Sequence, residues 1–112
     1  MVIYMNSNTS TTPLVCNMDV FTPTEREDHI QSTTQLYQSV QRINEVENGY
    51  EFTFPKESEM IAKLGKFISN EQLCCPFLEF TLKITSNNAS LLLAGPEGTQ
   101  EFLRAEFREA FL

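Results

Sequence analysis

The sequence predicts an α+β fold: an antiparallel sheet of four to five strands with about three helices packed on one face. Segments in which apolar residues recur every three or four positions are interspersed with pairs of segments in which apolar and polar residues alternate. The predicted order is strand, helix, two strands, helix, two strands, helix. Paired strands separated by single helices favour an antiparallel sheet with helices on one side.

The 112 residues are expected to form one domain. Residues 6–13 are polar, uncharged and without periodicity, so we expect residues 1–13 to be a flexible tail. Residues 14–112 then form a single α+β domain. Its first segment, residues 14–21, is interpreted as a strand or extended stretch that carries Cys16.

The first helix has a complete set of start signals. Thr22 suits the N-cap, Pro23 the first helical position, and Glu25 the reciprocal position of a capping box. The helix is expected to end near residue 40. Its apolar stripe is expected to comprise Ile30, Thr34, Tyr37 and Val40.

Two hairpins are predicted. The first covers residues 42–54, where Asn48-Gly49 suits a tight turn. The strand after that turn alternates between polar residues and the apolar Tyr50, Phe52 and Phe54. The second hairpin joins the alternating residues 78–84 to the apolar residues 91–94.

The second helix is expected from about residue 57 to residue 74, and Pro76 ends it because the residue before a proline avoids helical angles. Its core stripe is expected to be Ile61, Leu64 and Ile68. Thr99 is expected to cap a third helix. The buried side of that helix would comprise Leu103, Phe107 and Phe111.

The charge pattern excludes some classes of function. The net charge is −7 and the eight Lys and Arg residues are scattered, so we expect no nucleic-acid partner. The sequence shows no signal peptide and no long apolar run, so we expect no membrane association and a cytoplasmic location. Three cysteines, an odd number, argue against a secreted disulfide framework.

The adjacent Cys74 and Cys75, with Cys16 far upstream, concentrate the reactive groups of the chain. Three interpretations are open. The cysteines could pack as small apolar residues, they could bind a soft metal or metalloid as thiolates, or one sulfur could act in redox or nucleophilic chemistry. Neighbouring helical side chains point about 100° apart, but Pro76 takes Cys75 out of the helix and could let the sulfurs converge.

Electrostatics favour ligation over catalysis. The carboxyl end of a helix and the nearby Glu71 both raise a thiol pKa, which is the opposite of what a catalytic cysteine needs. A bound cation would reverse this, since coordination deprotonates thiols. The sequence therefore assigns no catalytic residue and favours a non-enzymatic role.

Two further residues are candidates beside the thiols. Glu71 lies on or beside the apolar face of the second helix, where it could be an oxygen ligand or a proton carrier. The alternative, which we favour, is that it bonds a neighbouring group or faces solvent. His29 lies one residue from the Ile30 stripe, so we expect it at the surface or the rim.

The motif Glu71-Gln72-x-Cys74-Cys75-Pro76-Phe77, followed by Phe80 in an alternating strand, resembles a family of small bacterial domains of unestablished activity. These domains occur alone or fused to the carboxyl end of mercury-responsive-type transcriptional regulators. The resemblance covers about residues 14–111 and includes the upstream Cys16. It implies a link to soft-metal or thiol stress, with Cys74, Cys75 and Cys16 as the candidate residues; the chain has no DNA-binding portion of such regulators, so no regulator role is implied.

The leading hypothesis is a domain that binds a soft metal or metalloid through Cys16, Cys74 and Cys75, for sensing or sequestration. That ion is the cofactor we expect. The alternative is a non-catalytic protein-interaction or small-ligand module with structurally buried cysteines. The nine phenylalanines could then leave an aromatic patch that drives homodimer formation. An enzyme that uses Glu71 or a thiol is the third hypothesis.

Overall fold

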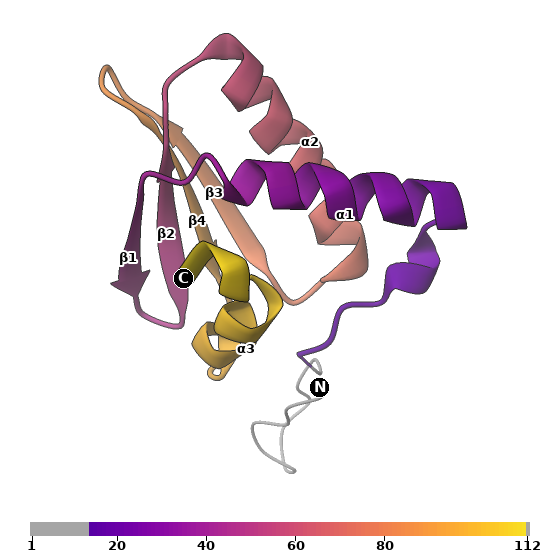
Figure 1. Ribbon diagram of the computed structural model, residues 1–112. Helices are drawn as coiled ribbons and strands as arrows, with labels where there is room; N and C mark the ends of the chain where they lie inside the picture. Colours follow the sequence, from indigo (N-terminus) through magenta and orange to yellow (C-terminus); the bar gives the residue numbers. More distant parts are fainter. Residues whose placement is uncertain (1–13, 112) are drawn as a thin grey trace.

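The computed structural model describes residues 14–111 and confirms the α+β fold: three α-helices pack on one face of a four-stranded antiparallel sheet (Figure 1). The strand order is β1-β2-β4-β3, and each pair of neighbours is antiparallel. The predicted tail, residues 1–13, lies outside the described residues. The helices are α1 (Pro23–Tyr37), α2 (Ser58–Cys74) and α3 (Thr99–Glu106). The strands are β1 (Arg42–Val46), β2 (Gly49–Phe54), β3 (Glu79–Ile84) and β4 (Ala89–Ala94).

The segment before α1 is not a strand, which corrects the prediction for residues 14–21. It holds a short 3-10 helix, η1 (Met18–Val20), whose first turn is capped by the Asn17 side chain. The amide of Asn17 donates to the carbonyl of Cys74 at 2.7 Å, at the end of α2. Because this backbone bonds the end of a helix instead of a sheet edge, the sheet has four strands.

Helix α1 begins as predicted. The hydroxyl of Thr22 accepts from the Glu25 amide at 3.2 Å, and the Glu25 carboxylate accepts from the Thr22 amide at 2.8 Å. The predicted buried stripe is wrong by one residue, because Ile30 is 47% exposed whereas His29 and Leu36 are buried. A buried His29 is tolerated because its ring has a polar partner on α2.

The first hairpin closes with a two-residue loop between the paired Val46 and Gly49. Asn48 takes the left-handed conformation that a tight turn needs, with φ of 54°. Gly49 is already the first residue of β2, and a Cβ there would collide with the carbonyl oxygen of Leu93 and with Ala94 on β4. Gly49 is therefore required by the close approach of β4.

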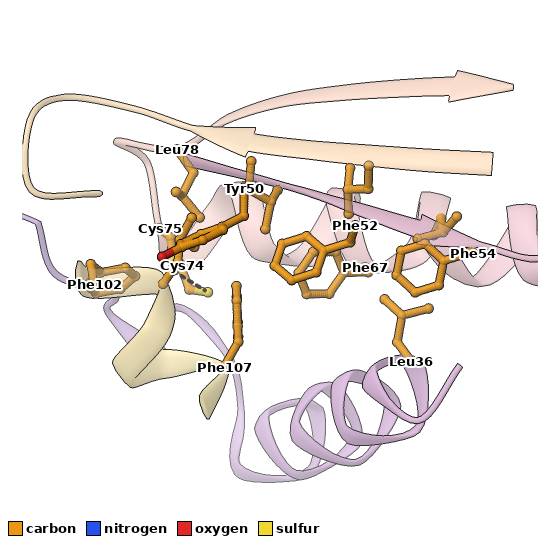
Figure 2. Close-up of a cluster of buried hydrophobic side chains, with 14 of the residues drawn as sticks. Leu36, Tyr50, Phe52, Phe54, Phe67, Cys74, Cys75, Leu78, Phe102 and Phe107 are labelled. Carbon is orange, nitrogen blue, oxygen red and sulfur yellow. Dashed lines mark hydrogen bonds between the residues drawn. The ribbon is translucent and has the colours of Figure 1, made fainter. Parts of the chain in front are cut away.

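The core lies between the inner face of the sheet and the helices (Figure 2). Tyr50, Phe52 and Phe54 on β2 pair with Leu93, Leu91 and Ala89 on β4. From the helices, α2 contributes Met60, Leu64 and Phe67, and the carboxyl-terminal segment contributes Phe102, Leu103 and Phe107. Cys74 and Cys75 lie at one end of this core.

Two helix assignments are refined. The predicted stripe of α2 is shifted, because Phe67 is buried while Ile61 and Ile68 are only partly buried. Helix α3 is capped by Gly98, with φ of 98°, and Thr99 is its first residue instead of its cap.

Among residues 14–111, no helix has both the length and the apolar character that crossing a bilayer requires.

The two glycines Gly49 and Gly65 give matched tests of this packing. Gly49→Ala should lower the free energy of unfolding by about 1–3 kcal/mol, because the new methyl group overpacks the β2–β4 contact. Gly65→Ala should raise it by about 1 kcal/mol, because alanine favours helix and a Cβ at this position of α2 meets nothing within 4 Å. Urea unfolding of the two variants checks both signs. A stable Gly49→Ala protein would contradict the strand register.

Candidate metal centre

The site forms where the segment before α1 meets the end of α2. Leu14 is fully buried and the Asn17 amide is bonded to the Cys74 carbonyl, so the backbone is held on both sides of Cys16. This places Cys16 against Cys75, 59 residues later in the chain, with their Cα atoms 4.4 Å apart. The convergence of the three cysteines, which the sequence left open and the metal hypothesis requires, therefore occurs in the structure.

The end of α2 lets the two adjacent cysteines point to the same place. Cys74 is the last helical residue, and Cys75 leaves helical geometry with φ of −124° and ψ of 73° ahead of Pro76. The two Sγ atoms are 3.6 Å apart. The break at Cys75 that Pro76 predicts thus brings together two side chains that a continuous helix would separate.

Cys16 and Cys75 are joined by a disulfide bond, and Cys74 is left as a free, buried thiol. The odd number of cysteines argued against a disulfide framework, and the structure holds one bridge with one thiol over. The burial of the three side chains differs: Cys74 is 1% exposed and Cys75 is fully buried, whereas Cys16 is partly exposed.

Glu71 is the polar centre of the cluster. Its side chain is only 3% exposed and lies one turn before the cysteines on α2. One carboxylate oxygen, Oε1, is 3.6 Å from the Sγ of Cys74, and the other, Oε2, is 3.5 Å from the Sγ of Cys75. Glu71 therefore bonds a neighbouring side chain, as one of the two interpretations had it, and it does so away from solvent.

His29 is the buried partner of Glu71, which corrects the expectation that it lies at the surface or rim. Its Nε2 is 2.8 Å from Oε1 of Glu71, and the residue is 3% exposed. A carboxylate can only accept, so Nε2 carries the proton whenever Glu71 is ionised. The ring lies between Phe21 and Phe67, with centroids at 5.3 and 6.0 Å. The seven-residue spacing from His29 to the buried Leu36 is the sequence signal that places both on one helix face.

The surroundings hold Cys74 in its protonated form. The pKa of its thiol is raised from 9.0 to about 12, mainly by burial and next by the negative charge of Glu71. Glu106 on α3 has a smaller effect of the same sign. A thiol with such a pKa is a poor nucleophile at neutral pH, which agrees with the expectation that the site is not built around an activated cysteine.

A cavity of about 290 Å³ is lined in part by Glu71. His29 and Glu71 line it from α1 and α2, and Glu106 and Arg108 line it from the carboxyl-terminal segment. Burial and the charge of Glu71 raise the pKa of the Glu106 carboxyl. Among the described residues, the Nδ1 atom of His29 has no hydrogen-bond partner. Sequence reasoning missed Glu106, which carries no local signal of its place in the fold.

The four donor groups of the cluster could hold one metal ion. One ligand atom each from Cys16, Glu71, Cys74 and Cys75 lie within 4.8 Å of one another. In a tetrahedral zinc site with Zn–S bonds of about 2.3 Å, two sulfurs are about 3.8 Å apart and a sulfur and a carboxylate oxygen about 3.5 Å apart. The observed separation of 3.6 Å between the sulfurs of Cys74 and Cys75 is close to the first value. Each Glu71 oxygen lies near the second value from one sulfur, with Oε1 3.6 Å from Cys74 and Oε2 3.5 Å from Cys75. Before an ion can bind to all four groups, the Cys16–Cys75 disulfide must be reduced.

The chain matches no protein-family model, no curated protein and no solved structure. The interpretation of the cluster therefore depends on its geometry and chemistry.

The raised pKa of Cys74 predicts a loss of stability in alkali. The folded state keeps a proton that the unfolded thiol releases above pH 9.0. The contribution of Cys74 to the free energy of unfolding is therefore complete below pH 9.0 and is lost as the pH rises towards about 12. Urea unfolding at rising pH checks it, with Cys74→Ala as the control that isolates the thiol. Glu71→Gln should shrink the wild-type loss more than Glu106→Gln does. Identical pH profiles for wild type and Cys74→Ala would contradict the assignment.

Proposed function

We propose that the reduced chain binds a soft metal or metalloid ion through the thiolates of Cys16, Cys74 and Cys75, for sensing or sequestration. The observation that carries this proposal is the gathering of three sulfurs and one carboxylate within 4.8 Å, from residues 59 positions apart in the chain. Glu71 supplies the fourth donor, or accepts hydrogen bonds from the sulfurs when it is not bound to the ion.

The donor set selects the kind of ion. Thiolate ligands favour Zn(II), Cu(I) and similar soft ions, whereas Mg(II) and Ca(II) need sites made of oxygens. Three thiolates beside the Glu71 carboxylate would be strongly repulsive in a buried site without a cation. A bound ion removes that repulsion and displaces the thiol protons. The burial and negative charge that raise the pKa of Cys74 therefore favour a bound cation once its thiolate has formed.

Glu71 is oriented for this role by its neighbour. The hydrogen bond from His29 fixes one carboxylate oxygen and leaves the carboxylate facing both Cys74 and Cys75. Groups that orient metal ligands from behind typically change metal affinity by about 10- to 100-fold when they are removed. His29 is therefore a positioning residue in the proposal and contributes no ligand atom.

The disulfide and the metal site are two states of the same sulfurs. With Cys16 bonded to Cys75, neither can offer a thiolate, and Cys74 alone remains. Reduction frees both, and the three-sulfur site requires only that the two sulfurs move apart to ordinary contact distance. Metal binding in the proposal is therefore restricted to the reduced protein.

The motif resemblance also supports metal binding at the cluster. Domains with the Glu-x-x-Cys-Cys-Pro-Phe pattern are associated with mercury-responsive-type regulators, and the matching residues here, Glu71, Cys74 and Cys75, are members of the cluster. Membership of that family is part of the proposal.

One observation favours a second candidate function, a protein-interaction or small-ligand module stapled by its cysteines. The disulfide closes a long loop, and in the chain-entropy model a loop of this length contributes about 4 kcal/mol to stability. Cys74 and Cys75 are also buried in the core. In this case the reduced protein is strongly destabilised and binds no ion.

Metal titration of the reduced protein tests the proposal. Native mass spectrometry should show one Hg(II) or Zn(II) ion per chain, and the double variant Cys74→Ser/Cys75→Ser should bind none. Glu71→Gln should retain binding with a lower affinity, because the three thiolates remain.

The oxidised wild-type protein is the matched control, because it has the same sequence and fold but lacks two of the three thiols. It should bind no ion at the concentrations that load the reduced form. Equal uptake by the reduced protein and by the double serine variant would show that the ion binds elsewhere and would reject the proposal.

A further inference from the structure

We propose that Cys16 is a modification site, at which a low-molecular-weight thiol forms a mixed disulfide and thereby opens the Cys16–Cys75 bond. This inference rests on the proposed function for its purpose, since it names the step that converts the disulfide form into the metal-binding form. Its chemistry follows from the unequal burial of the two bonded sulfurs.

Thiol–disulfide exchange begins when a thiolate reaches one sulfur of the disulfide, so access is one of the factors that determine which sulfur is attacked. Cys75 is fully buried, and Cys74 beside it is 1% exposed. Cys16 is partly exposed and lies in an irregular segment between Val15, which is 37% exposed, and the exposed Asn17. Of the two bonded residues, Cys16 is therefore the one with solvent-exposed surface.

The first exchange is balanced without any further oxidant or reductant. The attacking thiol gives up its proton, its sulfur bonds to Sγ of Cys16, and the bond between Cys16 and Cys75 breaks. The Cys75 sulfur leaves with the electron pair and takes up one proton, so the products are a mixed disulfide on Cys16 and a thiol on Cys75. The mixed disulfide projects on the accessible side, and Cys75 stays buried beside Cys74 and Glu71.

A second molecule of the thiol completes the conversion. It attacks the sulfur of the adduct, forms the small-molecule disulfide, and releases the Cys16 thiol. Two thiols are thereby oxidised and one protein disulfide is reduced. The three protein thiols are then free together, which is the state that the metal proposal requires.

An internal route competes with this one. The Sγ of Cys74 is 3.6 Å from that of Cys75, so attack by Cys74 could release Cys16 without any adduct. The product would be a disulfide between the adjacent residues Cys74 and Cys75. The two routes leave different bonds, and peptide mapping distinguishes them.

The experiment treats the oxidised full-length protein briefly with reduced glutathione, quenches with acid, and maps the adduct by mass spectrometry after digestion. In the folded protein the adduct should be found on Cys16, exceeding that on Cys75 by about tenfold or more. In urea, where both sulfurs are exposed, the two adducts should become comparable. Because the mapping uses the wild-type chain, no variant has to fold.

Three results would overturn the proposal: an adduct mainly on Cys75, no adduct in the folded protein, or free Cys16 with a Cys74–Cys75 disulfide. As a second measurement, the Cys74→Ser variant should give the same Cys16 adduct, because Cys74 takes no part in the external route. Protein reduced in denaturant and refolded needs no attack at Cys16, so its metal binding tests the proposed function separately.

Discussion

The burial of the Glu71 carboxylate is the constraint on which the arrangement depends. A carboxylate at 3% exposure is costly unless it is hydrogen-bonded, and His29 meets that need across the α1–α2 interface at 2.8 Å. This contact lies on the inward face of α1, which also buries Leu36, and it holds one oxygen of the carboxylate. Glu71 also lines the cavity that Glu106 lines.

The second constraint is the end of α2. Cys75 leaves the helix, and its amide still donates to the carbonyl of Glu71 at 2.8 Å, so the turn is tight and its side chain is returned towards Glu71. The segment that carries Cys16 is bonded to the same helix end through Asn17. Three sulfurs and a carboxylate are thus placed by backbone hydrogen bonds and core packing.

Much of the fold follows from local sequence signals. The capping box of Thr22 and Glu25, the alternation in β2 and the stop at Pro76 are each decided within a few residues, and each is found in the structure. The prediction of a strand or extended segment at residues 14–21 is wrong because the backbone of this segment bonds the end of α2, far away in sequence. The predicted buried face of α1 is wrong for a similar reason. Hydropathy favours burying Ile30, but a long-range partner makes the burial of His29 favourable instead.

The residues of the candidate cluster could be named from the sequence, whereas the bonds between them could not. Cys16, Cys74, Cys75 and Glu71 could be named because their residue types and the helix break are local properties. The disulfide depends on the meeting of two distant segments, and His29 depends on helix packing, so neither is encoded by spacing alone.

X-ray absorption spectroscopy of the reduced protein loaded with one equivalent of Zn(II) tests most directly whether the cluster is one donor set. We expect a first shell of three sulfurs at about 2.3 Å and one lighter atom at about 2.0–2.2 Å. A shell made only of oxygen and nitrogen, or one that contains a single sulfur, would contradict it.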